Sequence, residues 1–281
     1  DVYKRQELTY RVICGTDSEE IPVSLEGNSD SFRMKLSFLP NGNCVILPNI
    51  NGRGYGFFKI TEGESSGLWS VLRSSEDEVL KGSLLITLYE NLRWKTISPQ
   101  GFRDEMLAYL PNESNSLLFS MALSYLGDCQ RIFPSDSRPL EQALWKIVTT
   151  NPVSQHRLQA FRLYRSIADS EEAVQRLYTL WQERKAPKDC ALSESDYIGL
   201  SYILAIHLPE KADKIIATQL SRIQNPDRKK EYQFISPSVS PRKAERDSVF
   251  ASLLIAGNRR VEPWASSALA NFCLLYTSPS P

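Results

Sequence analysis

Few residues of this chain have the type and spacing that catalysis requires. It contains only two histidines, His156 and His207, which are 51 positions apart. A zinc peptidase needs two histidines one helical turn apart with a glutamate between them, in the pattern His-Glu-x-x-His. His207 precedes Leu208-Pro209 and so is expected at a helix C-terminus, where the helix dipole favours a histidine. We therefore expect neither a metal site nor a catalytic residue here.

The glycines of "GRGYG", Gly52, Gly54 and Gly56, could suggest a loop that binds phosphate. Such a loop must lead into a helix whose N-terminal amides point at the anion. Here it leads into "FFKI", a β-like segment, and no Lys-Ser/Thr pair follows the glycines. The pattern favours a turn that enters a strand and needs close approach of the backbone.

Nucleophilic residues lack the partners that would activate them. No Gly-x-Ser-x-Gly motif is present, and no cysteine has an evident partner histidine. The five cysteines are odd in number and include no Cys-x-x-Cys, which argues against a disulfide framework or a zinc knuckle, although one pair could bridge in an oxidising compartment. Paired carboxylates at 76–78 and 171–172 lie at predicted helix starts, where acidic residues stabilise the dipole.

Composition indicates a folded, soluble protein with no bias towards polyanions. Of the 281 residues, 42% are hydrophobic and 23% are charged, with 33 basic and 33 acidic side chains. Basic residues outnumber acidic ones by nine to six over 210–247, which we assign to solvated helix faces and not to a nucleic-acid site. No apolar run approaches the roughly 18–20 residues of a membrane span. The cellular compartment stays open between cytoplasmic and exported.

Residues 7–65 are predicted to form a small antiparallel β-sandwich. "SFRMKLSFL" alternates with a period of two, and the following "PNGN" contains an Asn-Gly pair that suits a tight turn, so 31–47 is predicted to be a β-hairpin. Apolar residues also alternate upstream of it. The residues expected on the buried faces are Leu8, Tyr10, Val12, Ile21, Val23, Leu25, Phe32, Met34, Leu36 and Phe38.

Residues 66–272 are predicted to be entirely helical. Capping-box spacing predicts helix starts at Ser75 with Glu78, Asp169 with Glu172 and Ser193 with Asp196. Ser98-Pro99 and Ser240-Pro241 each place a cap residue before a proline that fits the first helical position. Roughly ten helices of 10–20 residues result. Joined by short loops without a sheet, they predict a solenoid-like superhelix of the HEAT or armadillo type.

The order of these elements and motifs resembles the C-terminal region of aminopeptidase N-type zinc aminopeptidases, the gluzincin metallopeptidases of the membrane alanyl aminopeptidase type. "ILPNINGRGYGFFKI" and "SLLITLYENLRWKTISPQGF" are similar to the junction between the third and fourth domains of that family. Asn51 (or Asn49), Gly54 and Tyr55 would fill its Asn-x-x-Gly-Tyr-like motif at the entry to a strand. "LSESDYIGLSYILA", "NPDRKKEYQFISPSVSP", "RDSVF" and "NRRVEPW" are similar to the C-terminal region of bacterial members. The resemblance covers about 8–272.

The resemblance implies a non-catalytic C-terminal fragment of an enzyme that removes N-terminal residues from peptides. The family's His-Glu-x-x-His, its further zinc-binding glutamate, its Gly-x-Met-Glu-Asn and its transition-state tyrosine belong to earlier domains and are absent here. The expected partners are those catalytic domains and their peptide substrate, and the zinc belongs to them. This chain alone is predicted to bind no cofactor and to be inactive.

In that family the helical domain curves over the catalytic domain and encloses a chamber. The candidate lining residues are Arg246, Asn258, Arg259 and Glu262. The favoured alternative is that these four form buried salt bridges and caps that fix helix packing.

Both ends of the chain look foreign to it. Residues 1–6, "DVYKRQ", and 273–281, "CLLYTSPSP", resemble the translated adapter sequence that contaminates metagenomic assemblies. We therefore expect them to be non-native and the natural protein to continue past both. A second hypothesis is a freestanding α-solenoid scaffold that binds a protein or peptide, which the reading frame upstream of residue 7 would distinguish from the enzyme.

Overall fold

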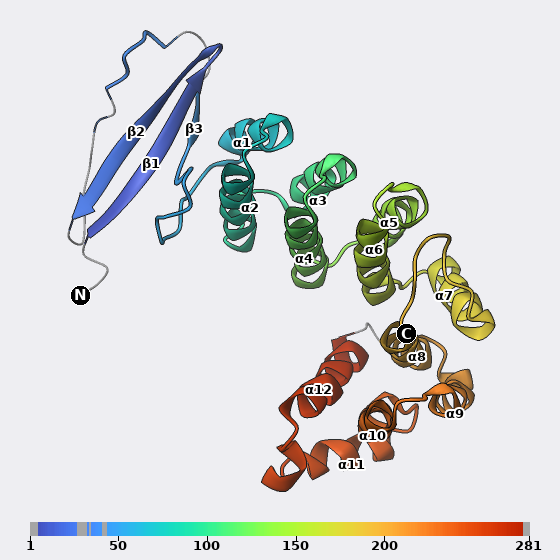
Figure 1. The fold of residues 1–281 in the computed structure, drawn as a ribbon. Helices are drawn as coiled ribbons and strands as arrows, with labels where there is room; N and C mark the ends of the chain where they lie inside the picture. Colours follow the sequence, from blue (N-terminus) through green and yellow to red (C-terminus); the bar gives the residue numbers. More distant parts are fainter. Residues whose placement is uncertain (1–4, 27–32, 34, 41–43, 278–281) are drawn as a thin grey trace. The chain divides into compact units, whose positions relative to one another are not determined.

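A computed structural model describes residues 5–26, 33, 35–40 and 44–277 of the chain (Figure 1). In these residues the protein is mainly helical, with a small three-stranded antiparallel sheet followed by twelve α-helices that pack in pairs. The chain divides into two compact units, Asp1–Ser135 and Asp136–Pro281. The sheet and the first four α-helices belong to the first unit, and the other eight belong to the second.

The sheet has the strand order β2-β1-β3. Its strands are β1 (Arg5–Cys14), β2 (Asp17–Glu26) and β3 (Cys44–Leu47). The turn between β1 and β2 contains Gly15 with a φ of 62°, a backbone angle that costs glycine little. The predicted alternation is confirmed at Leu8, Val12 and Val23, which are buried. The strands are therefore half-buried, as a period of two requires.

The predicted hairpin over 31–47 is wrong. Residues 33 and 35–40 contain no strand, while Phe32, Met34 and 41–43 lie outside the described residues. Within the described residues only the second predicted strand is present. It is β3, which pairs antiparallel with β1 through Val12↔Ile46 and Ile13↔Val45. Alternation marks a strand-like segment, but the choice of partner depends on long-range packing that the pattern does not contain.

One disulfide joins the two strands of this second ladder. Cys14 and Cys44 are direct cross-strand partners, and their sulfurs are bonded across a sequence separation of 30. The expectation that the cysteines form no disulfide framework allowed for one such pair. Cys129 and Cys190 are buried thiols elsewhere in the chain. Burial raises the pKa of both thiols, so neither is poised to act as a thiolate nucleophile.

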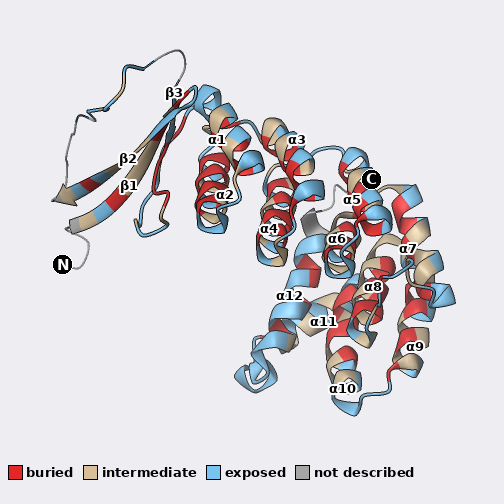
Figure 2. Cartoon of the chain, turned by 45° about the horizontal axis from the view of Figure 1, so that its top comes forward, coloured by how far each residue is buried: buried red, intermediate tan, exposed pale blue. Residues whose placement is uncertain are grey.

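The first unit continues with two helical pairs. They are α1 (Glu62–Ser74), α2 (Glu78–Arg93), α3 (Pro99–Tyr109) and α4 (Ser116–Ile132), with a short 3-10 turn η1 (Leu110–Asn112) before α4. Leucines at helical spacing explain α2, since all of them are at most 1% exposed: Leu80, Leu84, Leu85, Leu88 and Leu92. Figure 2 shows buried residues along α2 and α4 as continuous stripes. Burial of each such leucine side chain stabilises the folded state by about 1.5–3 kcal/mol.

The second unit holds the remaining helices, and neighbouring helices are again in contact. They are α5 (Arg138–Thr150), α6 (Ser154–Ile167), α7 (Glu171–Glu183), α8 (Glu194–His207), α9 (Ala212–Arg222), α10 (Pro226–Ile235), α11 (Lys243–Ser252) and α12 (Glu262–Thr277), with 3-10 turns η2 (Pro209–Lys211), η3 (Ser236–Val239) and η4 (Ala256–Arg259). The contacting pairs include α5 with α6, α7 with α8, and α6 with α8. Phe161, Tyr164 and Leu200 are fully buried in this part of the unit.

Two of the five predicted helix starts are confirmed. Ser193 forms the capping box with Asp196, and Ser98 caps α3 with Pro99 in its first turn. The other three are displaced by one or two residues. The N-cap of α2 is Asp77 and that of α7 is Ser170, while α11 begins only at Lys243.

Ser75 and Ser240, two residues expected to be N-caps, instead end the preceding helical elements. Their hydroxyls accept hydrogen bonds from the amides of Asp77 and Arg242. Several cap-type side chains stand side by side in these loops, and the spacing does not say which one the helix uses.

Candidate functional site

The glycine stretch forms a tight junction between the sheet and the helices of the first unit. Asn49, with a φ of 50°, binds Gly54 through two hydrogen bonds, Gly54 N to Oδ1 at 2.7 Å and Nδ2 to Gly54 O at 3.1 Å. The Ser83 hydroxyl on α2 donates to the Asn49 carbonyl at 2.6 Å. A Cβ on Gly54 would lie 1.9 Å from Leu8 Cδ2, so this position needs glycine.

The other residues of the predicted motif also bind the sheet. Asn51 Nδ2 donates to Thr9 Oγ1 at 3.0 Å, and the Tyr55 amide donates to Gln6 Oε1 at 2.8 Å, while the Tyr55 side chain is 80% exposed. The close approach of the backbone was predicted and is present. The strand expected to follow is not, because 53–60 contains neither helix nor strand. This segment is a hydrogen-bonded connection and offers no helix N-terminus to a phosphate.

Three of the four residues proposed to line a chamber donate hydrogen bonds to carbonyls six residues earlier. Arg246 Nη1 binds Ser240 O at 2.7 Å, Asn258 Nδ2 binds Ser252 O at 2.9 Å, and Arg259 Nη1 binds Leu253 O. The last two satisfy carbonyls at the end of α11, which a helix C-terminus leaves without intrahelical partners. Glu262 begins α12, where a carboxylate favours the dipole. Asn258, Arg259 and Glu262 are exposed and Arg246 is half-buried, so the structure shows local caps and not the buried salt bridges of the alternative.

The two histidines lie on different helices of the second unit. His156 is fully buried on α6, and His207 is the last residue of α8, as expected. Burial lowers the pKa of His207, against the opposing influence of Asp169 and Glu141. Among the described residues, no three His, Cys, Asp or Glu side chains are grouped so that they could hold a metal ion.

A hollow of the second unit lies between α5 and α7, with a volume of about 730 Å³. Glu141, only 3% exposed, forms one wall, and its carboxylate accepts hydrogen bonds from the amides of Asp169 and Ser170 and from the Ser170 hydroxyl. Burial alone would raise the pKa of Glu141, but these hydrogen bonds outweigh it and lower the pKa. Glu141 thus stays ionised and fixes the start of α7 against α5.

Trp145 lies one helical turn after Glu141 on α5 and also lines this hollow. The guanidinium of Arg176 lies over its indole ring at 4.6 Å, donates to Tyr164 Oη at 2.9 Å and pairs with Glu172 at 2.6 Å. Lys146 and Glu171 add charges of both signs to the lining. The hollow therefore combines an aromatic surface with both charges, a lining that suits a polar peptide more than an apolar ligand.

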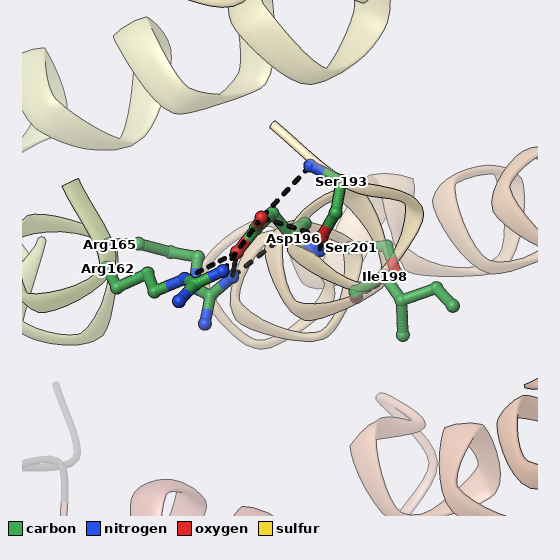
Figure 3. A network of polar contacts seen from close by, with 6 residues as sticks. All are labelled: Arg162, Arg165, Ser193, Asp196, Ile198 and Ser201. Atoms are coloured by element: carbon green, nitrogen blue, oxygen red, sulfur yellow. Dashed lines mark hydrogen bonds and ion pairs between the residues drawn. The ribbon is translucent and has the colours of Figure 1, made fainter. Parts of the chain in front are cut away.

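A second polar network joins α6 to the start of α8 (Figure 3). Asp196, 4% exposed, accepts from Arg162 Nε at 2.9 Å and Nη2 at 3.3 Å, and from the Ser193 amide at 3.0 Å and hydroxyl at 2.7 Å. Arg165 Nη1 lies 3.8 Å from the same carboxylate and donates to the Asp196 carbonyl at 3.1 Å. Burial would raise the pKa of Asp196, but these partners lower it, so the carboxylate is charged.

A third buried carboxylate lies in the first unit. Glu113 receives a salt bridge from Lys81 on α2 and hydrogen bonds from the Tyr109 hydroxyl and, at 2.6 Å, from the Asn115 amide. The Glu113 side chain is 1% exposed and that of Lys81 is 14% exposed. The Lys81 ammonium also lies 5.6 Å from the Tyr109 ring centroid. This cluster connects α2, α3 and the start of α4.

Sequence reasoning missed all three carboxylate networks. Arg162 and Arg165 are three residues apart, as are Asp196 and Gly199, so each pair was visible as one face of a helix. The sequence pattern does not indicate that these two helix faces are in contact. Ser193–Asp196 was predicted as a capping box, which is correct, but this box is also the acceptor of the two arginines.

The comparisons with known proteins add no relative: no protein-family model and no curated protein matches this chain.

None of the helices in the described ranges combines the length and the hydrophobicity needed to cross a bilayer.

Proposed function

We propose that this chain is the non-catalytic C-terminal region of a zinc aminopeptidase of the aminopeptidase N type. In this proposal the sheet is part of a linking β-sandwich, and the paired helices form a solenoid-like wall over the catalytic domain. That wall excludes folded proteins and admits peptides. Zinc and the reacting groups belong to the catalytic domains that precede the sheet.

The observation that carries the proposal is the junction at Asn49 and Gly54. The residues of the resemblance make specific contacts there, because Asn49 holds Gly54 and Gly54 lies against Leu8. The same segment is bound to α2 through Ser83. A hydrogen-bonded joint between a sheet and the first helical pair suits a domain that must hold a helical wall in a fixed place. The succession from strands to paired helices adds support.

The decisive experiment is to sequence the source DNA upstream of this frame. A His-Glu-x-x-His motif followed by a further glutamate, in the same frame, would support the proposal. A start codon just before residue 7 would overturn it.

Activity provides an independent test. The purified chain, incubated with zinc and an aminoacyl chromogenic substrate, is expected to give no turnover above buffer. Fusion to the upstream catalytic domains is expected to give hydrolysis. Turnover by the chain alone would contradict the assignment of all catalytic groups to other domains.

The hollow between α5 and α7 favours a second candidate, a freestanding scaffold that binds a peptide. Its lining of Trp145, Arg176 and charges of both signs would suit an extended polar segment. Under this alternative, Trp145→Ala should abolish binding to peptides selected from a displayed library, whereas Trp94→Ala, at an exposed tryptophan of the first unit, should leave binding intact. Peptides that bind both variants equally would exclude the hollow as their site.

A further inference from the structure

The Arg162–Arg165–Asp196 network contains more positive than negative charge. Two guanidinium groups share one carboxylate, and within the described residues Asp196 is the only acidic side chain within 4.0 Å of either arginine. The neighbouring cations are each matched, Arg157 with Asp189 at 3.5 Å and Arg228 with Glu194 at 3.4 Å. The network therefore keeps one positive charge that no carboxylate balances.

Both arginines also have donors to spare. Arg162 uses Nε and Nη2 for Asp196, and Arg165 uses Nη1, so Arg162 Nη1 and Arg165 Nη2 make no hydrogen bond with any described residue. Figure 3 shows terminal nitrogens of both guanidinium groups that carry no dashed line and lie on the same side of the network. The side chains of Arg162 and Arg165 are 49% and 20% exposed.

A glycine on α8 makes room for this arrangement. A Cβ on Gly199 would lie 2.6 Å from Arg165 Nη1 and 2.8 Å from its Cζ, so the guanidinium rests directly against the helix backbone. Gly199 also lines a hollow of about 330 Å³ between α8, α10 and α12. The charged and polar lining of that hollow includes Arg228, Glu231 and Asn271, and neither Arg162 nor Arg165 belongs to it.

Burying part of a charge without a counter-charge is unfavourable, and a bound anion would relieve it. Burial lowers the pKa of the Arg165 guanidinium, Asp196 opposes this and Arg162 acts in the same direction as burial. Guanidinium groups present planar sets of donors that match the oxygens of carboxylate and phosphate.

We propose that Arg162 and Arg165, seated against Gly199, bind an oxyanion, either a carboxylate or a phosphate group. The inference goes beyond the proposed function and does not depend on it, because a chamber wall and a freestanding scaffold could both carry such a site.

The test is isothermal titration of the purified full chain with inorganic phosphate and, separately, with malonate, at constant ionic strength set by chloride. Saturable binding of either anion, accompanied by a rise in Tm, is the expected result. Arg165→Met should weaken it by about ten- to a hundredfold, since charge-assisted hydrogen bonds are lost. The arm with the tighter binding identifies phosphate or carboxylate as the preferred group.

Two further variants separate a site from general charge effects. Gly199→Ala keeps every arginine but pushes the Arg165 guanidinium from its place, so it should also weaken binding, and it remains informative if Arg165→Met does not fold. Arg242→Met removes an arginine that Asp213 and Glu245 already balance, and it should leave binding unchanged. Absence of saturable binding by the folded wild type, or equal losses in Gly199→Ala and Arg242→Met, would overturn the proposal.

Discussion

The two units of this chain solve the burial of a carboxylate in different ways. In the first unit, Glu113 is enclosed, with one ammonium, one phenol and one amide directed at it. In the second, Asp196 faces two guanidinium groups, whose side chains are 49% and 20% exposed and which keep unused donors. One cluster is neutral and closed, and the other is positive and open.

The two clusters therefore differ in what they can do: one only stabilises the fold, and the other could also bind a ligand. A closed, neutral cluster has no surplus charge that would attract a ligand, so its contacts serve only to join α2, α3 and α4. An open cluster with surplus donors still holds α6 to α8 and keeps the capacity to bind an anion. Because burial of charge is tolerated only when it is paired, the unpaired arginine is the informative one.

Breaking the closed cluster should have the largest effect. Lys81→Met leaves Glu113 buried without its cation, and we expect the free energy of unfolding to fall by about 3–5 kcal/mol. Urea unfolding followed by circular dichroism measures it. Lys230→Met, which removes one member of an exposed pair with Asp227 at 3.8 Å, is the matched control and should cost less than about 0.5 kcal/mol. Similar losses in both variants would contradict the distinction.

Breaking the open cluster should cost less. Asp196→Asn keeps the shape of the side chain but removes the charge that two arginines and the Ser193 hydroxyl share, so we expect a loss of about 1.5–3 kcal/mol. The same urea experiment applies. Asp213→Asn, in an exposed pair with Arg242, serves as control and should stay within about 0.5 kcal/mol. A loss larger than that of Lys81→Met would reverse the ranking of the two clusters.

Acid should lower the stability that the closed cluster provides, by less per pH unit than either substitution above. Burial raises the pKa of Glu113, but the hydrogen bonds from Lys81, Tyr109 and Asn115 outweigh it, so the folded-state pKa lies below the usual value of 4.5. The unfolded chain therefore takes up the proton first. The contribution of Glu113 to stability is complete above pH 4.5 and is lost as the pH falls through the folded-state pKa, at no more than about 1.4 kcal/mol per unit.

Glu113→Gln removes this titration. Its free energy of unfolding, measured by urea at several acidic pH values, should decline less steeply than that of the wild type. Parallel curves would show that Glu113 does not carry the predicted linkage. The Asp196→Asn variant should flatten the curve as well, because the pKa of Asp196 is also lowered, from a usual value of 3.8.

Local patterns predicted the elements of this fold better than their partners. The Ser193–Asp196 box is local and was predicted, because one turn decides it. The hairpin over 31–47 failed because β3 pairs with β1, a choice that depends on contacts far along the chain. The Asp196 network was missed for the same reason, since α6 must first pack on α8.

The disulfide between Cys14 and Cys44 changes what a break in the chain would do. It encloses the whole of β2 and the segment that follows within one covalent loop. A protease that cleaves once between residues 15 and 43 would therefore leave two fragments that migrate together on a non-reducing gel and separate only after reduction. Residues inserted into this loop should leave β1 and β3 joined, because the disulfide still connects the two strands.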